Sequence, residues 1–417
     1  MVVRTEYLER IRPFFDQKLV KVIVGVRRCG KSVLLQQIRD ELLAGGADME
    51  DITLVNFESF DTKELRNPEN LHSFLKKRIK GKKKPYILLD EVQLVDGFED
   101  VVNSLQAEGK VSVFITGSNS RLLAGEMATL LSGRYVSFQV MPFNFREYRQ
   151  YMHEKNPGIV FPMEFPFESA PSSESILAQY LQWGGFPLVC EQSDDAAKEV
   201  VIDDLYTSIV LRDIMDRNNV GKGAPIQNVL DFLIANSSNL INGKKISDTL
   251  TSNNMKVSSG KVYEYLNYIE DAFIVSFAER YDIAGKSALR YEKKAYVCDL
   301  GLFHAKKNRT KNEFSHIVET VIYNELVSRG YKVYVGRTRK GEIDFVVMKG
   351  DKRCYIQAAY LMQDDATIER EFGAFDCVDD SYPKYVVSMD PITQDLKGVK
   401  HLRLIEFLEA PSLLQLG

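Results

Sequence analysis

The sequence contains few of the residues that would build a disulfide framework or a metal centre. Its 417 residues include only five cysteines and five histidines. The cysteines are odd in number, lie far apart and form no Cys-x-x-Cys pair, and no metal-ligand spacing links them to the histidines. This pattern favours reduced thiols in a cytoplasmic protein over a disulfide-stabilised secreted domain.

The sequence also lacks the apolar segments that a membrane span or an export signal requires. No stretch approaches the roughly 18–20 consecutive apolar residues of a spanning helix, and the N-terminal segment carries acidic residues instead of a long apolar core. The net charge of -4 creates no overall positive field that would attract nucleic acid. We therefore expect a cytoplasmic protein with no membrane partner, in which any nucleic-acid contact comes from a local patch.

The length and the order of elements predict several domains of α/β type. A chain of 417 residues is too long for one hydrophobic core. Near the N-terminus, apolar runs at 19–24, 53–57, 86–89 and 111–116 alternate with helical periodicity, which predicts a parallel sheet with helices on both faces. A stretch rich in Pro, Ser and Glu at 154–175 indicates a boundary. The expected domains are residues 1–160, a mainly helical segment 170–295, and a second α/β segment 296–417.

The most specific motif is the segment GVRRCGKS, from Gly25 to Ser32, which follows an apolar run and opens a helix. Glycines at this spacing allow successive backbone N–H groups to face phosphate oxygens, while the lysine reaches the β- and γ-phosphates and the serine hydroxyl binds Mg²⁺. The motif therefore predicts a P-loop that binds ATP with Mg²⁺. The expected nucleotide-binding residues are Gly25, Arg28, Cys29, Gly30, Lys31, Ser32 and Val33.

Two carboxylates, Asp90 and Glu91, end the apolar run Tyr86–Leu89. Ligands of parallel sheets bind at the carboxyl ends of the strands, where the P-loop also lies. We expect Asp90 to hold Mg²⁺ together with Ser32, and Glu91 to polarise the attacking water. Lys31 and Glu91 are thus the first two catalytic candidates.

Two further catalytic candidates are Asn119 and Arg134. Thr116, Ser118 and Asn119 end the next apolar run, and we favour Asn119 over Ser118 as a side chain that senses the γ-phosphate; ordinary turn chemistry is the alternative. Arg134 precedes another apolar run. It is expected to stabilise transition-state charge, either in its own subunit or across the interface of a homo-oligomer, unless it is simply a solvated residue at a strand start.

The segments GVRRCGKS, LLDEVQ, ITGSNSRLL and LLSGRY, in this order and spacing, resemble the AAA-type ATPases of bacteria and archaea that carry a C-terminal domain of unknown function. Three later segments match the same group: GGFP at 184–187, IVLRDI at 209–214 and VCDLGL at 297–302. The resemblance therefore extends over nearly the whole chain. It implies ATP binding, a winged-helix segment and a C-terminal fold related to restriction-endonuclease-like nucleases.

The middle of the chain has helix-turn-helix order. Residues 245–252 and 258–269 are expected to be helices, and 273–278 and 294–297 the two strands of a wing. Interleaved acidic residues leave two alternatives open, contact with DNA or docking of a protein. The expected phosphate contacts are Lys244, Lys245, Lys256, Lys261, Lys286 and Arg290.

The resemblance places the carboxylates of a nuclease-like core at Glu319 and Asp344. Gln357 and Ala359 stand where such a core carries its second acid and its lysine, and the nearby Lys340 and Lys352 are assigned to loops. We therefore expect a fold that does not cut DNA, because the group that would compensate developing charge is missing. The leading hypothesis is a Mg²⁺-dependent ATPase whose cycle drives a conformational switch controlling DNA or protein binding. The alternative is an ATP-regulated nuclease acting on DNA.

Overall fold

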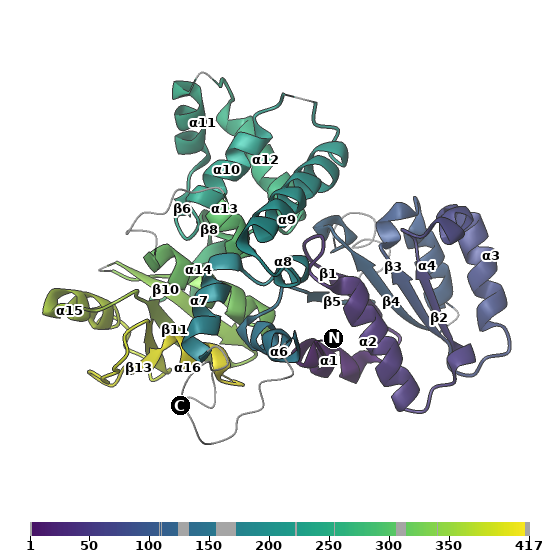
Figure 1. Ribbon diagram of the computed structural model, residues 1–417, viewed down its shortest axis with the longest axis horizontal. Coiled ribbons are helices and arrows are strands. Elements are labelled where there is room, and N and C mark those ends of the chain that lie inside the picture. Colours follow the sequence, from purple (N-terminus) through teal and green to yellow (C-terminus); the bar gives the residue numbers. More distant parts are fainter. Residues whose placement is uncertain are drawn as a thin grey trace. The chain divides into compact units, whose positions relative to one another are not determined.

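The computed structural model describes residues 2–107, 109, 111–123, 133–155, 172–221, 223–253, 255–305, 314–339 and 341–412. They belong to two compact units (Figure 1). The N-terminal unit is Val2–Val140 with Asp271–Phe273, and the C-terminal unit is Met141–Glu270 with Ile274–Gly417. The division falls before the boundary expected at 160, since helix α6 (Phe145–Lys155) packs against α7 (Ser173–Trp183) of the C-terminal unit.

The described part of the N-terminal unit contains a five-stranded parallel sheet in the order β2-β3-β4-β1-β5. The predicted parallel α/β sheet is therefore confirmed. Strands β1, β3 and β4 are buried along their whole length, as their continuous apolar runs require. The strands are β1 (Val20–Val24), β2 (Ile52–Asn56), β3 (Tyr86–Asp90), β4 (Ser112–Gly117) and β5 (Tyr135–Gln139).

The helices of this unit connect the strands, and α2 packs on β3 and β4. They are α1 (Thr5–Ile11), α2 (Lys31–Ala44), α3 (Pro68–Ile79) and α4 (Phe98–Ala107), with the short 3-10 segments η1 (Arg12–Phe14), η2 (Met49–Asp51), η3 (Phe60–Arg66), η4 (Val92–Leu94) and η5 (Ser120–Leu123). None of the helices described anywhere in the chain is long and apolar enough to cross a membrane.

The C-terminal unit is built on a mixed sheet in the order β13-β12-β11-β10-β9-β7-β8-β6. Its strands are β6 (Leu240–Ile241), β7 (Val275–Asp282), β8 (Ser287–Val297), β9 (Lys332–Arg337), β10 (Glu342–Lys349), β11 (Lys352–Ala358), β12 (Lys384–Ser388) and β13 (Lys400–Arg403). The four strands expected near the C-terminus correspond to β9–β12. Lys352, expected in a loop, begins β11.

The two helices expected at 245–252 and 258–269 correspond to α11 and α12 of the C-terminal unit. In addition to α6 and α7, the helices of this unit are α8 (Pro187–Cys190), α9 (Asp195–Ser208), the π-helical η6 (Ile209–Asp216), α10 (Ile226–Ala235), α11 (Gly243–Ser252), α12 (Ser259–Asp271), α13 (Leu300–Ala305), α14 (Phe314–Ser328), α15 (Asp365–Gly373) and α16 (Leu404–Glu409). The side chain of Arg290 lies outside the described residues.

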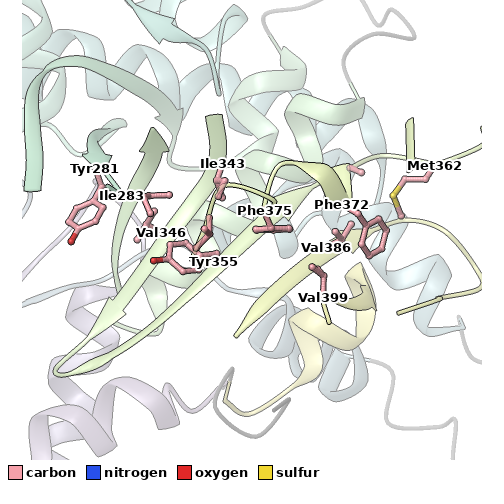
Figure 2. Packing of buried hydrophobic residues seen from close by; sticks show 12 residues of the cluster. Tyr281, Ile283, Ile343, Val346, Tyr355, Met362, Phe372, Phe375, Val386 and Val399 are labelled. Atoms are coloured by element: carbon pink, nitrogen blue, oxygen red, sulfur yellow. The ribbon is translucent and has the colours of Figure 1, made fainter. Parts of the chain in front are cut away.

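The strands expected to form a wing, β7 and β8, belong to the same sheet as the C-terminal strands. β7 pairs with β9 in parallel, and β8 continues through the boundary expected at 295. Tyr281 of β7 packs in one hydrophobic cluster with Ile343, Val346 and Tyr355 of β10 and β11 (Figure 2). The local sequence pattern predicted the two strands. It did not show that β7 pairs with β9 and packs, through Tyr281, against strands from the last part of the chain.

Asp299 explains two of the motifs that the resemblance rests on. It lies in VCDLGL, and its carboxylate accepts hydrogen bonds from the N–H groups of Gly185 (2.7 Å) in GGFP and of Gly301 (2.9 Å). Gly184 has a φ of 72°, and a Cβ on it would lie 1.8 Å from the carboxylate. Burial raises the pKa of Asp299 to about 7, although the backbone N–H groups favour the ionised form. The two motifs thus specify a packed turn of the C-terminal unit.

Lys21 is an interior lysine of the N-terminal sheet. Its Nζ donates to the backbone oxygen of Gln17 (3.1 Å) and to Ser112 Oγ (2.7 Å), and it lies 4.4 Å from the centre of the Phe114 ring. The side chain is inaccessible to solvent. Burial disfavours the charged form and lowers the pKa of Lys21 from 10.5 to about 7.

This lowered pKa predicts a pH dependence of stability that Lys21→Met should abolish. Between the folded pKa of about 7 and the unfolded value of 10.5, the unfolded chain binds more protons than the folded one. Stability therefore rises with pH in this window, by up to about 1.4 kcal/mol per pH unit. Urea unfolding followed by circular dichroism should show this rise in the wild type relative to Lys21→Met. Lys18→Met removes an exposed lysine nearby and should keep the wild-type profile.

Candidate active site

The carboxyl ends of β1, β3 and β4 bring the predicted site residues to one edge of the N-terminal sheet. The P-loop follows β1 directly, Asp90 ends β3, and Asn119 follows β4. Parallel register aligns these ends, with Val24 opposite Gly117 and Leu89 opposite Ile115. The three segments therefore meet because parallel strands finish on the same side of a sheet.

The P-loop backbone requires its glycines. Gly25 has a φ of 155°, and a Cβ on it would lie 2.2 Å from the carbonyl oxygen of Val140. Gly30 has a φ of 103° directly before α2, and Arg28 also adopts a positive φ of 65°. Cys29 is buried, and burial raises the pKa of its thiol, so it contributes its backbone rather than a thiolate. Arg28 is exposed and Val33 is half-buried at the start of the helix.

Lys31 places a buried positive charge inside this loop. Its Nζ donates to the carbonyl oxygens of Gly25 and Val26, each at 3.2 Å, and lies 3.7 Å from Glu91 Oε1. Only 3% of the residue is exposed. These acceptors hold the ammonium at the base of the loop, where phosphate oxygens would be stronger partners.

Asp90 and Ser32 form a pair of oxygen ligands next to Lys31. The Asp90 carboxylate accepts a hydrogen bond from Thr116 Oγ1 (2.6 Å) and another from the Ser32 hydroxyl. Burial raises the pKa of Asp90, while these hydrogen bonds favour its ionised form. A hydroxyl and a carboxylate are hard ligands that suit Mg²⁺, whose remaining positions are usually filled by phosphate and water. In the described residues, no group of three or more His, Cys, Asp or Glu side chains is arranged to hold a metal ion.

Glu91 is fixed by two residues that the sequence did not single out as site residues. Its backbone N–H donates to Thr116 Oγ1 (2.9 Å), the hydroxyl that also holds Asp90. Gln93 Nε2 donates to Glu91 Oε2 and lies 3.5 Å from Ser118 Oγ. Glu91 has a φ of 56°, a left-handed conformation that is uncommon for a glutamate. Two features of the sequence could have identified these residues: a polar side chain near the end of β4, and a glutamine two residues after Glu91.

Asn119 and Arg134 lie at opposite ends of the sheet. Asn119 is buried and follows β4 at the P-loop edge. Arg134 is exposed and precedes β5, and its carbonyl oxygen accepts a hydrogen bond from Val20 N (2.9 Å) at the amino end of β1. The length of β1 separates Arg134 from the P-loop by about 13 Å, at about 3.3 Å per residue. This placement opposes a role of Arg134 in its own site and leaves two alternatives, a role across subunits and a solvated residue at a strand start.

Comparison with protein-family models gives two matches. Residues 17–149 match the AAA domain, which covers the P-loop and the carboxylates at the ends of the strands. Residues 174–313 match a domain of unknown function, DUF8612. The N-terminal part of the chain is thus a P-loop domain of the AAA ATPase type.

Among solved structures, the Orc1 protein of Aeropyrum pernix in complex with DNA is 14% identical and covers 73% of this chain and 92% of its own, with a TM-score of 0.31. An uncharacterized protein of Methanocaldococcus jannaschii is 29% identical over 363 residues, 86% of this chain and 78% of its own length. An uncharacterized protein of Haemophilus influenzae is 34% identical over 410 residues, 98% of both chains. This chain, with its N-terminal AAA domain, therefore belongs to the same family as the Haemophilus influenzae protein.

Proposed function

We propose that the protein is a Mg²⁺-dependent ATPase whose binding and hydrolysis of ATP drive a conformational switch that controls the binding of DNA or of a protein partner. The observation that carries this proposal is the shared hydroxyl of Thr116. It holds the Asp90 carboxylate and the Glu91 backbone together, directly beside the P-loop lysine. A metal ligand and a water-activating carboxylate are thereby positioned by one side chain.

Each residue of the site has a separate role in this proposal. Lys31 pairs the β- and γ-phosphates, and Ser32 with Asp90 would hold Mg²⁺, which neutralises charge on the phosphate oxygens. Glu91 orients the attacking water and accepts its proton, while Gln93 keeps the carboxylate in place. Asn119 senses the γ-phosphate from the end of β4.

The segment that follows the sensing residue provides a route for the switch. Ser120 Oγ donates a hydrogen bond to the carboxylate of Asp271, the last residue of α12. Residues Asp271–Phe273 belong to the N-terminal unit, whereas the rest of α12 belongs to the C-terminal unit. Asn119 directly precedes Ser120. A change at Asn119 on hydrolysis would therefore reach the last residue of α12 through this hydrogen bond.

The role of Glu91 predicts that Glu91→Gln binds ATP but hydrolyses it about 10² times more slowly, because a positioned base is lost. Lys31→Ala should lose ATP binding, since it removes the cation that pairs the phosphates. Binding of a fluorescent ATP analogue and release of inorganic phosphate separate the two effects. Wild-type turnover in Glu91→Gln would show that another group activates the water.

The position of Arg134 predicts complementation between subunits. Arg134→Ala and Lys31→Ala should each be inactive, and a mixture of the two should regain part of the activity, because one interface then combines an intact P-loop with an intact arginine. Mixing Lys31→Ala with Glu91→Gln serves as the control, since both changes lie in the same site. Absence of any gain, with subunit exchange demonstrated, would contradict the role across subunits.

The helix-turn-helix pair supports contact with DNA, with protein docking as the other outcome. Lys256 is exposed between α11 and α12, whereas Lys261 forms an exposed ion pair with Glu264 (2.8 Å) for which a phosphate must compete. Replacing both lysines by alanine should weaken binding to duplex DNA and reduce the slope of log affinity against log salt by about one to two units. Lys397→Ala with Lys400→Ala removes the same charge elsewhere and serves as the control. No binding by the wild type at low salt, with or without ATP, would favour protein docking.

A further inference from the structure

One end of the C-terminal sheet contains a buried lysine among carboxylates. Glu319 lies on α14 and Asp344 on β10. Lys294 reaches them from β8, with its Nζ 2.8 Å from Glu319 Oε1 and 3.5 Å from Asp344 Oδ1. A third carboxylate, Glu342, lies 2.7 Å from the same Nζ. The missing lysine of the expected pattern is therefore replaced by one that lies earlier in the chain.

The three carboxylates are also held by other donors. Tyr296 donates its hydroxyl hydrogen to Glu319 (2.7 Å), the N–H of Ala358 donates to Asp344 (2.9 Å), and Arg280 Nη2 pairs with Glu342 (3.0 Å). Each of the three carboxylates thus has a second donor besides Lys294. The cluster is therefore an ordered part of the fold rather than a group of solvated acids.

The two positions that depart from the nuclease pattern are used for structure. Gln357 Oε1 accepts a hydrogen bond from the N–H of Asp344 (3.3 Å), so its oxygen serves the backbone. Ala359 is buried in the hydrophobic cluster of the sheet. Neither residue supplies a charged ligand to the cluster.

Two cations face the cluster. Lys294 Nζ lies within 3.5 Å of all three carboxylates, and Arg280 pairs with Glu342. Burial, followed by the neighbouring Glu319, raises the pKa of Asp344 to about 8, which favours its neutral form near pH 7. Burial alone would lower the pKa of Lys294, but the three carboxylates raise it, and the ammonium stays charged.

We propose that Lys294 Nζ is the resident cation of this cluster and takes the place of a divalent metal ion, so that the cluster does not support metal-dependent cleavage. The distances of 2.7–3.5 Å suit an ammonium group hydrogen-bonded to carboxylates, whereas Mg²⁺ requires oxygens at about 2.1 Å in octahedral geometry. An ammonium and a divalent ion at one point would repel each other strongly in this buried setting. This inference is independent of the proposed ATPase activity.

The cluster is accessible to metal ions, which makes the proposal testable in solution. A largely polar cavity of about 430 Å³ borders it. Lys294, Glu319 and Glu342 line one part of this cavity, and Lys245 of α11 lines another. A metal ion could therefore approach Glu319 and Glu342 from this cavity.

The test compares Mn²⁺ binding by proteins with and without Lys294, measured by calorimetry and electron paramagnetic resonance in the absence of nucleotide. All of these proteins carry Asp90→Asn, which disables the N-terminal site. We expect no Mn²⁺ binding that depends on Asp344 when Lys294 is present. Lys294→Met should bind one Mn²⁺ ion at least tenfold more tightly than the protein with intact Lys294. Adding Asp344→Asn should then remove this binding. Lys294→Arg keeps the positive charge and should not gain this site.

Three results would overturn the proposal. The first is Mn²⁺ binding that depends on Asp344 while Lys294 is intact. The second is cleavage of supercoiled DNA by the wild type with Mg²⁺ or Mn²⁺ that disappears in Asp344→Ala, because metal and lysine would then act together. The third is a folded Lys294→Met protein, checked by circular dichroism, that gains no Mn²⁺ site. The first two measurements use intact Lys294 and decide the question even where Lys294→Met fails to fold.

Discussion

The parallel pairing of β1 with β4, and of β4 with β3, is the constraint on which the candidate active site depends. It brings the loop after Val24, the carboxylates after Leu89 and the polar end of β4 to one edge. At that edge Thr116 closes the arrangement, because its hydroxyl accepts from the Glu91 backbone and donates to Asp90. A chain that paired these strands in another order would still contain the P-loop sequence, but its lysine would have no carboxylates beside it.

The same pairing separates what the sequence could predict from what it could not. The P-loop, Asp90 and Glu91 were predictable because each motif contains its own strand end and its own chemistry. The distance of Arg134 from the P-loop was not predictable in this way, since it depends on the partner of β5. Lys294 shows the limit most clearly: its carboxylate partners lie on α14 and β10, far along the chain, and no spacing within its own strand indicates them.

Burial alone does not decide what an interior lysine does. Lys21 and Lys294 are both buried, yet their neighbours differ in kind. Lys21 has one carbonyl, one hydroxyl and an aromatic ring as its contacts, and burial lowers its pKa to about 7. Lys294 has three carboxylates, which raise its pKa against the same effect of burial. Burial of Lys21 is unfavourable for its charged form and the sheet tolerates it. Lys294, in contrast, is the group that allows three carboxylates to lie close together.

The two charged centres lie in different units of the chain. The contacts described for Lys31, Asp90 and Glu91 lie within the N-terminal unit, and those described for Lys294 lie within the C-terminal unit. In the proposed switch, Asp271 is where a signal from hydrolysis would pass, because it ends α12 and is counted with the unit that contains the P-loop. The Ser120–Asp271 hydrogen bond then joins the loop after Asn119 to a helix whose other turns lie in the C-terminal unit.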